Sequence, residues 1–540
     1  MKRTSVILFS LFLGVSCAPK KQIVAPSAPT EIEMNHKKFM SLFIKATNEA
    51  QIENDDKAIE MYEQCKKLNP KESAVYFELS RLYAKQRNAQ MAYENANKAN
   101  ELSPKNKWYL LQKAQVLNRT GQQEKAIDAF EELISIESNN LGALYELAEL
   151  YQRSEKPLEA VKTIERIEVI TGKNPQMSYQ KYLLLLEGGK ENEALKEIEE
   201  LLKLEPENGM GNLAMAQHFT KIGEEQKVYK RLVFVFEDPQ IRTDTKLSIL
   251  EDYIKKMKTS SVAEKEAESL VMIMLKTHPS DVKSYAAAGD LYSNLNDLNK
   301  ANTYYEKALV YATQSYPIFM QLMDNSFNLK DFDQVTTYAT QALESYPTQP
   351  VLYLYKGMGH KELKQNELAV KAFKSGQGIV VDNEKLEYEF WSKLGETYHE
   401  LKEFKLSDES FDKAMKINGL DAYLLNNYSY YLSLRKVKLE KAAEMAKTAN
   451  DLFPNNASFN DTYGWILYQQ GNFVEAEKWI KKSLSNGGET SGTVLEHYGD
   501  VLYKLNSQDS KALEYWNKAK LAGDYSDSLD KKIKEGKNEE

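Results

Sequence analysis

Two stretches of the sequence decide the fold: SAVYFELSRLYAKQRNAQMAYENANKANELSP, residues 73–104, and VKSYAAAGDLYSNLNDLNKANTYYEKALVYAT, residues 282–313. Each places aromatic residues on both sides of a small residue in its first half. A polar turn follows, and then a second half in which alanines recur about one helical turn apart. This spacing predicts two amphipathic helices joined by a short turn.

The same pattern continues along most of the chain at a step of 34 residues. It places repeat starts at 39, 73, 107, 141, 175, 209, 248, 282, 316, 350, 388, 422, 457 and 492. A step of this length, kept over so many units, indicates an internal repeat. Each unit of such an array buries its apolar face only against its neighbours, so the chain is expected to form a long stack.

Small residues recur at positions 8 and 20 of the repeat, where the two helices of one unit are predicted to cross closely. Tyrosine at position 11 is predicted to pack toward the neighbouring unit, and proline at position 32 ends the second helix. The position-8 residues include Ala46, Ser80, Ala114, Ala148, Gly289, Gly357, Gly395 and Gly499, and the position-20 residues include Ala58, Ala92, Ala126, Ala160, Ala301 and Ala369.

These features resemble the tetratricopeptide repeat, which has large residues at positions 4 and 7, a small residue at 8, Tyr at 11, small residues at 20 and 27, an aromatic at 24 and Pro at 32. The resemblance covers about residues 39–522. It implies an all-α superhelical solenoid of about 14 helix-turn-helix units with a concave inner face.

Two steps depart from 34 residues. The step from 209 to 248 is 39, and the step from 350 to 388 is 38. The first contains EDPQIRTDTKLS, residues 237–248, which is interpreted as a longer surface loop in a drifted repeat, or else as a hinge or partner-specific surface. It divides the array into six units at 39–242 and eight units at 243–525. The charged tail, residues 526–540, is predicted to begin as a short solvated helix and then to fray.

The first 17 residues, MKRTSVILFSLFLGVSC, predict a secretory signal peptide over residues 1–16. Basic residues stand at positions 2 and 3, and the apolar core of about ten residues is half the length of a membrane span. The small residue followed by Cys17 resembles the lipobox of bacterial lipoproteins, which implies a lipid on Cys17 and a flexible tether over residues 17–38. Because no acidic residue follows Cys17 directly, the resemblance implies an outer-membrane lipoprotein that faces the periplasm.

The sequence lacks the motifs of a catalytic, metal or cofactor site. The six histidines are scattered, and in HELKE, residues 399–403, Glu403 stands where a zinc-binding helix needs its second histidine. Cys65 is at a position that takes a small apolar residue and is predicted to be a packed core thiol. The formal net charge of −8 disfavours nucleic acid. We therefore expect no catalytic residue, no metal, no cofactor, no small-molecule substrate and no nucleic-acid partner.

The resemblance implies that the concave face is lined by positions 2, 5, 9 and 12 of each first helix. The candidate groove residues are Phe77, Arg81, Met320, Asp324, Phe327, Tyr430, Trp465, Tyr468, Asp500 and Tyr503. Their aromatic and acidic character toward the C-terminus favours a peptide or helix with some basic residues. The alternative is that the aromatic rings only help adjacent units to stack.

The sequence as a whole therefore predicts a non-enzymatic envelope scaffold. It would bind other cell-envelope proteins in its groove while a lipid anchors it to the outer membrane. Two alternatives remain open: a cytoplasmic co-chaperone or adaptor built from the same repeats, and an enzyme with a cryptic site near the irregularity at residues 237–262.

Overall fold

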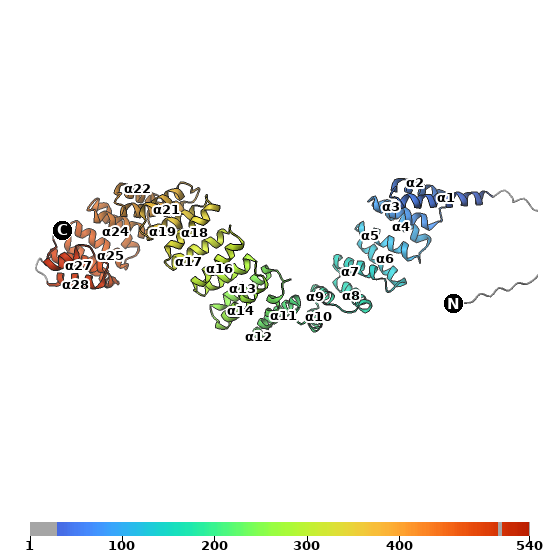
Figure 1. Ribbon diagram of the computed structural model, residues 1–540, viewed down its shortest axis with the longest axis horizontal. Coiled ribbons are helices and arrows are strands. Elements are labelled where there is room, and N and C mark those ends of the chain that lie inside the picture. The colour runs from blue at the N-terminus through green and yellow to red at the C-terminus, as the bar shows by residue number, and fades with distance from the viewer. Residues whose placement is uncertain (1–29, 506–509, 539–540) are drawn as a thin grey trace, which may run out of the picture. The chain divides into compact units, whose positions relative to one another are not determined.

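The computed structural model describes residues 30–505 and 510–538, and every regular element in these ranges is a helix. The helices α1 to α28 form consecutive hairpins, each a first and a second helix, and a short helix α29 follows (Figure 1). A 3₁₀ turn at Gly488–Thr490 precedes α27. The predicted all-α repeat fold of fourteen hairpins is confirmed.

The helix bounds of the N-terminal half are α1 (Glu31–Gln51), α2 (Asp55–Leu68), α3 (Ser73–Lys85), α4 (Ala89–Leu102), α5 (Lys107–Arg119), α6 (Gln123–Ile136), α7 (Leu141–Arg153), α8 (Pro157–Thr171), α9 (Pro175–Glu187), α10 (Glu191–Leu204), α11 (Gly209–Lys221) and α12 (Glu225–Glu237). Those of the C-terminal half are α13 (Thr243–Met257), α14 (Ser261–Thr277), α15 (Val282–Asn294), α16 (Leu298–Tyr311), α17 (Tyr316–Asn328), α18 (Phe332–Ser345), α19 (Pro350–Glu362), α20 (Asn366–Gln377), α21 (Glu384–Glu400), α22 (Phe404–Ile417), α23 (Ala422–Leu434), α24 (Leu439–Leu452), α25 (Ala457–Gln469), α26 (Phe473–Ser485), α27 (Gly492–Leu505), α28 (Ser510–Ala522) and α29 (Leu529–Glu535).

The chain divides into two compact units within α12: the first ends at Val235 and the second begins at Phe236. The sequence pattern places its boundary a few residues later, between 242 and 243. In the first unit one continuous apolar cluster runs through successive hairpins from Leu110 to Met215. The core of this unit is therefore a row of contacts between neighbouring repeats, as expected for a stacked array.

The 34-residue step follows from the lengths of the parts of one hairpin. In the second repeat α3 has 13 residues and α4 has 14, and they are joined by a three-residue turn and followed by a four-residue link. The turn closes because its middle residue takes a left-handed conformation, as Arg87 does with φ of 59°. The next N–H, that of Asn88, then donates to the carbonyl of Tyr83 at 2.9 Å, which completes a Schellman-type cap.

The small residues at positions 8 and 20 meet as predicted. The hydroxyl of Ser80, at position 8, donates to the carbonyl of Ala92, at position 20, over 2.9 Å. In the eleventh repeat the roles are reversed, since the hydroxyl of Ser407 at position 20 donates to the carbonyl of Gly395 over 2.8 Å. Such side chain to backbone contacts require helices that cross very closely, which the small residues permit.

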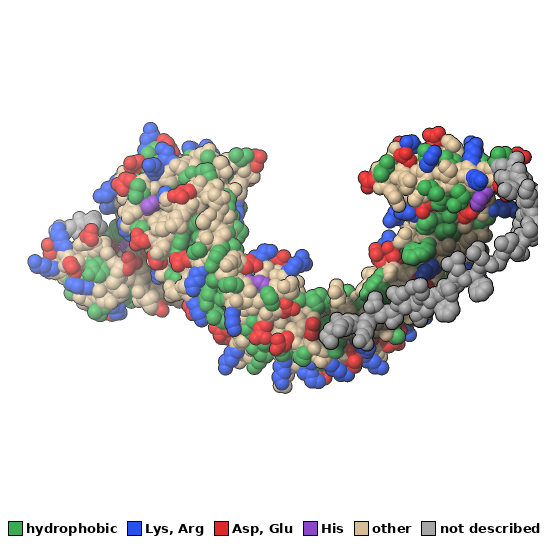
Figure 2. All heavy atoms as spheres, turned by 45° about the vertical axis from the view of Figure 1, so that its right-hand side comes forward, with side chains coloured by type: hydrophobic (Ala, Val, Ile, Leu, Met, Phe, Trp, Pro, Cys, Tyr) green, Lys and Arg blue, Asp and Glu red, His purple; other side chains and the backbone are tan. Residues whose placement is uncertain are grey.

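Neighbouring repeats are joined through the tyrosine at position 11, which was also predicted. The hydroxyl of Tyr83 donates to Glu63 of the preceding repeat at 3.4 Å, and Tyr151 donates to Glu131 in the same way. Both glutamates occupy position 25 of the repeat before. On the outer surface Lys, Arg, Asp and Glu side chains are interspersed over the face of the described residues shown in Figure 2, as expected for solvated helix faces.

The two irregular steps lengthen helices, so the expectation of a longer surface loop is wrong. At the second irregularity α21 begins at residue 384, which is 34 residues after the start of α19, and has 17 residues where most first helices have 13. At the first irregularity α13 has 15 residues and α14 has 17. Added residues of about one helical turn can continue the hydrogen-bonded ladder, which costs less than an irregular loop.

The first helix begins earlier than the repeat frame. Thr30 caps α1 by a reciprocal pair of hydrogen bonds with Glu33, so residues 31–38, which the sequence pattern places in the tether, are helical. The predicted signal peptide and the lipidation site Cys17 lie outside the described residues. In the ranges that the structure covers, no helix combines the length and the apolar character that crossing a membrane requires.

The predicted tail helix is present as α29, but it is not solvated on all sides. Leu529 and Lys532 are both buried, and Asn538, beyond the helix, is buried as well. The expectation of a purely solvated and fraying tail is therefore wrong for residues 529–538. The reason is a set of polar contacts with α25 and α27.

Candidate functional site

The ten predicted groove residues all lie on first helices of hairpins, in three separate places. Phe77 and Arg81 are on α3 in the first unit; Met320, Asp324 and Phe327 are on α17; and Tyr430, Trp465, Tyr468, Asp500 and Tyr503 are on α23, α25 and α27. The structure thus brings together five residues near the C-terminus and two facing a groove in the middle of the second unit.

Near the N-terminus, Phe77 connects two repeats. Its ring centroid lies 5.0 Å from that of Tyr109 on α5. Arg81 is exposed, forms an ion pair with Glu78 at 2.9 Å, and lies over the Phe77 ring. These contacts fit the alternative interpretation, in which an aromatic ring on the inner face helps adjacent repeats to stack.

In the middle of the second unit, first helices α15, α17 and α19 border a groove of about 470 Å³, which we call the central groove. Its lining residues are Ser293, Asn296, Leu298, Gln321, Asp324, Asn325, Phe327, Asn328, Tyr355 and Met358. Both apolar side chains and primary amides line it. This mixture suits an extended or helical peptide, whose side chains need apolar contacts and whose backbone needs hydrogen-bond partners.

Two of the three predicted residues face this groove. Asp324 accepts a hydrogen bond from the hydroxyl of Tyr355 in the next repeat, and Phe327 lies edge-on to Phe332 with centroids 5.4 Å apart. Burial and the neighbouring carboxylate raise the pKa of Tyr355 above its ordinary value, so the tyrosine remains a neutral donor. Met320 is half-buried against the core and does not line the groove.

The third place, the C-terminal site, is built around Trp465. Its indole ring is stacked on His497, with centroids 3.8 Å apart and 9° between the planes, and on Tyr468 at 4.7 Å and 8°. The Nδ1 atom of His497 lies 3.0 Å from a carboxylate oxygen of Asp461. Tyr430, on α23, has its ring centroid 6.5 Å from that of His497. An aromatic stack with a buried carboxylate behind it therefore spans three repeats.

Two acidic residues one helical turn apart complete the C-terminal site. Glu496 and Asp500 on α27 are both buried, and the Nζ atom of Lys532 from α29 lies between them, 2.9 Å from Glu496 and 2.7 Å from Asp500. Asp500 also accepts a hydrogen bond from Nε1 of Trp516 at 2.9 Å. The fifth predicted residue, Tyr503, lies beside this group, with its ring centroid 5.8 Å from that of Trp516.

Burial and hydrogen bonding act differently on the two carboxylates. Burial raises the pKa of Asp500 to about 6, although the attraction of Lys532 opposes this change. Burial also acts to raise the pKa of Glu496, but hydrogen bonds from Ser526 and Lys532 outweigh it and hold that pKa below its ordinary value. The site therefore stabilises the charged form of Glu496.

The sequence patterns missed the residues that complete this site. His497 had no motif partner, because Asp461 lies 36 residues before it in the sequence. Lys532 stands in a run of charges that is typical of a solvated tail. The only local signal is that Leu529 and Ile533 are four residues apart and so share one face of a short helix with Lys532.

The first irregularity, at residues 237–262, contains a buried lysine that is satisfied structurally. The Nζ atom of Lys246 donates to the carbonyls of Phe236 and Asp238 at 2.8 and 2.9 Å and lies 2.7 Å from Nε2 of His278. Burial lowers the pKa of Lys246 to about 8. A lowered amine pKa can mark a nucleophile, but this side chain has no exposed surface and its hydrogen-bonding capacity is used. It binds the end of α12 to α13 and α14.

His399, in the HELKE segment, is half-buried. Its ring is stacked on Tyr431 with centroids 3.8 Å apart, and burial lowers its pKa to about 4. Cys65 is fully buried, which confirms the predicted core thiol. In the residues with described coordinates, no three His, Cys, Asp or Glu side chains come together in an arrangement that could hold a metal ion.

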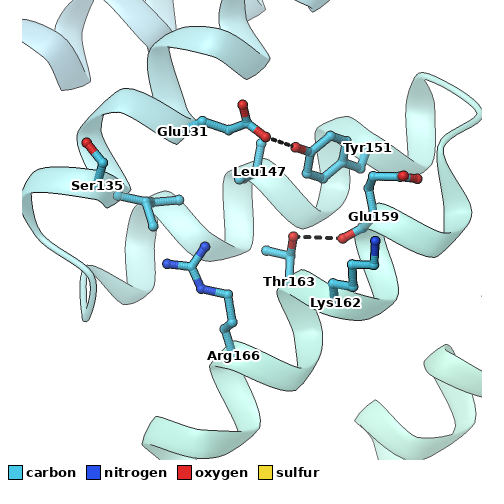
Figure 3. Close-up of a pocket in the computed structure, with 9 residues that line it drawn as sticks. Glu131, Ser135, Leu147, Tyr151, Glu159, Lys162, Thr163 and Arg166 are labelled. Atoms are coloured by element: carbon cyan, nitrogen blue, oxygen red, sulfur yellow. Dashed lines mark hydrogen bonds between the residues drawn. The ribbon is translucent and has the colours of Figure 1, made fainter.

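A further hollow, of about 490 Å³, lies between α6, α7 and α8 of the first unit (Figure 3). Charged side chains border it: Lys162 and Arg166 from α8, and Glu131 from α6, which accepts the hydrogen bond of Tyr151. Its walls therefore offer long, solvated side chains more than a fixed apolar surface. This makes it a weaker candidate for peptide binding than the central groove.

Comparison with known proteins gives a family match within single hairpins. Residues 41–72, 109–140, 282–311 and 388–419 match the model of the tetratricopeptide repeat. These segments fall in the hairpins that begin with α1, α5, α15 and α21.

Among curated proteins, the type IV pilus assembly protein PilF of Pseudomonas aeruginosa is 29% identical over 101 residues, which are 18% of this chain and 40% of PilF. The TPR repeat-containing protein PA4667 of the same organism is 33% identical over 64 residues, 12% of this chain and 11% of that protein. The chain thus spans less than half the length of either relative. Among solved structures, a chain of Naa15/Naa10 bound to HypK-THB is 14% identical, with a TM-score of 0.41, over 92% of this chain and 79% of that chain. Yeast Tom70 is 17% identical, with a TM-score of 0.30, over 93% and 100%.

Proposed function

The chain is a tetratricopeptide-repeat protein, and on that premise we propose that it is a scaffold that binds protein partners along the first-helix face of its repeats. Repeats of this family are generally protein-binding and non-catalytic, and the proposal includes no reaction. The fold alone does not select a partner, because one architecture serves many functions. The proposal therefore depends on the surface that this particular chain presents.

The observation that carries the proposal is the central groove. Phe327 and Met358 give it apolar walls, and the half-buried carboxylate of Asp324 gives it one fixed polar anchor. Gln321 and Asn328 on its rim are exposed and carry both donors and acceptors. An apolar groove with a few converging polar groups is the usual form of a peptide-binding surface, and the carboxylate favours a partner segment that carries a basic residue.

Crosslinking in intact cells tests this function. A tagged wild-type chain, a Phe327→Ala variant and a Thr340→Ala variant would be compared, because Thr340 is exposed on α18, the second helix of the same hairpin, and does not line the groove. We expect a defined partner that is crosslinked by the wild type and by Thr340→Ala, and that is reduced at least about tenfold in Phe327→Ala. Equal recovery from all three chains would refute binding in the central groove.

We also propose that the scaffold works in the cell envelope as a lipoprotein anchored through Cys17 to the outer membrane and facing the periplasm, with other envelope proteins as its partners. The support is the sequence of the first 17 residues: two basic residues, a short apolar core, a small residue and then cysteine. Two acyl chains on this cysteine would hold such a protein stably at a membrane.

Metabolic labelling with radioactive palmitate tests the anchor. We expect label in the wild-type chain, and no label in a Cys17→Ser chain that is still exported. An unlabelled wild-type chain that fractionates with cytoplasmic proteins would refute the anchor and favour a cytoplasmic adaptor. Neither result changes the prediction for the central groove, so the location and the binding function are tested separately.

A further inference from the structure

Residues 524–538 run across the first-helix face of the last two hairpins and contact it at four places. The carbonyl of Asp524 accepts from the hydroxyl of Thr493 at 2.8 Å, and the backbone N–H of Ser526 donates to Glu496 at 2.7 Å. Lys532 lies between Glu496 and Asp500, and the side-chain amide of Asn538 donates to the hydroxyl of Tyr468 at 3.1 Å. The chain thus places its own segment where the repeat pattern predicts a bound peptide.

The site requires a cation. With residues 524–538 in place, Glu496 is 3% exposed and Asp500 is 1% exposed, so an occupant of this site withdraws two carboxylates one turn apart from water. Buried carboxylates are strongly destabilising unless an opposite charge and hydrogen bonds compensate them. A lysine fits the space between them, and Lys532 fills it at hydrogen-bonding distance from both.

The segment that supplies this lysine has little helical or apolar stabilisation of its own. Helix α29 has seven residues, well below the length at which an isolated helix is stable in water. Leu529 is its one fully buried apolar side chain, and Ile533 is partly buried. The link that leads to it begins with Gly523 and Asp524, both in left-handed conformations, so it turns sharply away from α28.

The segment also leaves polar groups of this face unpaired. Nε1 of Trp465 and Oδ1 of Asn426 are buried, and neither has a hydrogen-bond partner among the residues described in the structure. Both side chains are more than nine-tenths buried and lie on the first helices of adjacent repeats. The indole N–H of Trp465 is a donor and the amide oxygen of Asn426 is an acceptor, so the C=O and N–H groups of an extended peptide backbone can pair with them.

We propose that the C-terminal site binds a lysine-bearing segment of a partner protein, and that residues 524–538 are an intramolecular competitor that occupies it when the partner is absent. This inference deepens the proposed scaffold function and rests on it. The pattern of the occupant defines the partner chemistry: an apolar residue three positions before the lysine and another directly after it, as in Leu529, Lys532 and Ile533. The partner segment would fill the same pocket and would in addition pair with Trp465 and Asn426.

The backbone path of the competitor depends on a glycine. A methyl group at Gly492, the first residue of α27, would overlap the carbonyl of Gly523. The close approach of these two backbones aligns Ser526 and Lys532 with α27. Two features of α27 therefore position the segment: the absence of a side chain at residue 492, and the acidic pair at residues 496 and 500.

A peptide titration with the purified full chain tests the proposal. The probe is a fluorescently labelled peptide with the sequence of residues 524–538, followed by anisotropy. The wild-type chain holds its own copy, so we expect weak binding, whereas Leu529→Ala and Lys532→Ala chains should bind at least about tenfold more tightly because their own segment is released. Leu529→Ala is the second variant in case the loss of Lys532 disturbs folding, since it leaves the acidic pair and the lysine in place.

Matched peptides separate a specific site from general attraction of charge. A peptide with Lys532→Ala should lose binding to the Leu529→Ala chain, whereas one with Lys534→Ala should keep it, because Lys534 is exposed in the bound segment. Failure of both released chains to bind the labelled peptide would overturn the proposal and leave α29 as a structural cap. Equal loss with both altered peptides would overturn it as well. The titration reads this site alone, so its failure is distinguishable from a failure at the central groove.

Discussion

The most direct test of the packing between paired helices is Gly395→Ala in α21. A Cβ atom at residue 395 would lie 2.9 Å from three atoms of the Phe411 ring on α22, about 0.6 Å closer than carbon atoms normally approach. The ring cannot move away easily, because it is fully buried and Tyr428 of the next repeat is stacked on it at 4.8 Å. The substitution therefore forces Phe411 or the helix to shift.

Two opposing terms set the magnitude of this effect. Overpacking of a tight core costs about 1 to 3 kcal/mol, and replacing a glycine within a helix by alanine gains about 1 kcal/mol. We therefore expect Gly395→Ala to be destabilised by about 1 kcal/mol. The matched control is Gly142→Ala in α7, where a Cβ atom meets only the side-chain oxygen of Asn140 at 3.6 Å, so the helix-propensity gain remains and the variant should be slightly more stable.

Hydrogen exchange measured by mass spectrometry is the suitable assay, because stability in a repeat array is local. Peptides from α21 and α22 should exchange faster in Gly395→Ala, and peptides from the first unit should be unchanged. In a Phe411→Leu background the same substitution should cost less, since the smaller side chain leaves room. A Gly395→Ala chain as protected as the wild type, or as stabilised as Gly142→Ala, would show that Phe411 does not resist a methyl group at residue 395.

Three further substitutions test other parts of the structure. Burial lowers the pKa of His399 to about 4, so the unfolded chain binds a proton at a higher pH than the folded chain, and the free energy of unfolding falls as the pH falls from about 6.5 toward 4. In urea unfolding at pH 7 and pH 4, a His399→Phe chain should lose about 2 kcal/mol less stability than the wild type, and identical pH dependence would contradict this. Lys181 is 2% exposed and its Nζ atom lies 2.8 Å from Glu168 and from Glu197, so Lys181→Met should destabilise the first unit by about 3 kcal/mol. Lys203→Met, at an exposed ion pair, should cost less than about 1 kcal/mol, and equal effects of the two substitutions would be inconsistent with a buried ion triad. Lys330 takes a left-handed conformation with φ of 59°, which is strained for a residue with a Cβ atom, so Lys330→Gly should raise the free energy of unfolding by about 0.5 to 1 kcal/mol. A lower melting temperature in this variant would argue against strain in this turn.

The repeat frame could be predicted from the sequence because its determinants are local. Eleven of the fourteen predicted starts, from 73 to 492, coincide with the first residue of a first helix. The spacing of small and aromatic residues at positions such as Gly395 and Phe411 fixes both the helix length and the crossing point. The starts at 39, 248 and 388 differ because extra residues extend helices there, and the marker residues alone cannot tell a longer helix from a longer loop.

The candidate site was only partly predictable. The frame placed Trp465, Tyr468 and Asp500 on one face, because residues at equivalent positions of stacked repeats point the same way. Tyr468 and Asp500 have hydrogen-bond partners in the tail, 30 or more residues later, and these contacts depend on where a short charged helix docks. Charge runs such as the one around Lys532 are usually solvated, and nothing local distinguishes a buried lysine from its exposed neighbours.

Site-specific photocrosslinking in living cells shows whether partner proteins bind on the first-helix face. A photoreactive amino acid would replace Phe327 in the central groove or, as a control, Thr340 on the second helix of the same hairpin. We expect a discrete crosslinked protein from position 327 and none from position 340. The same crosslinks from both positions, or none from position 327 in any growth condition in which the chain is made, would contradict it.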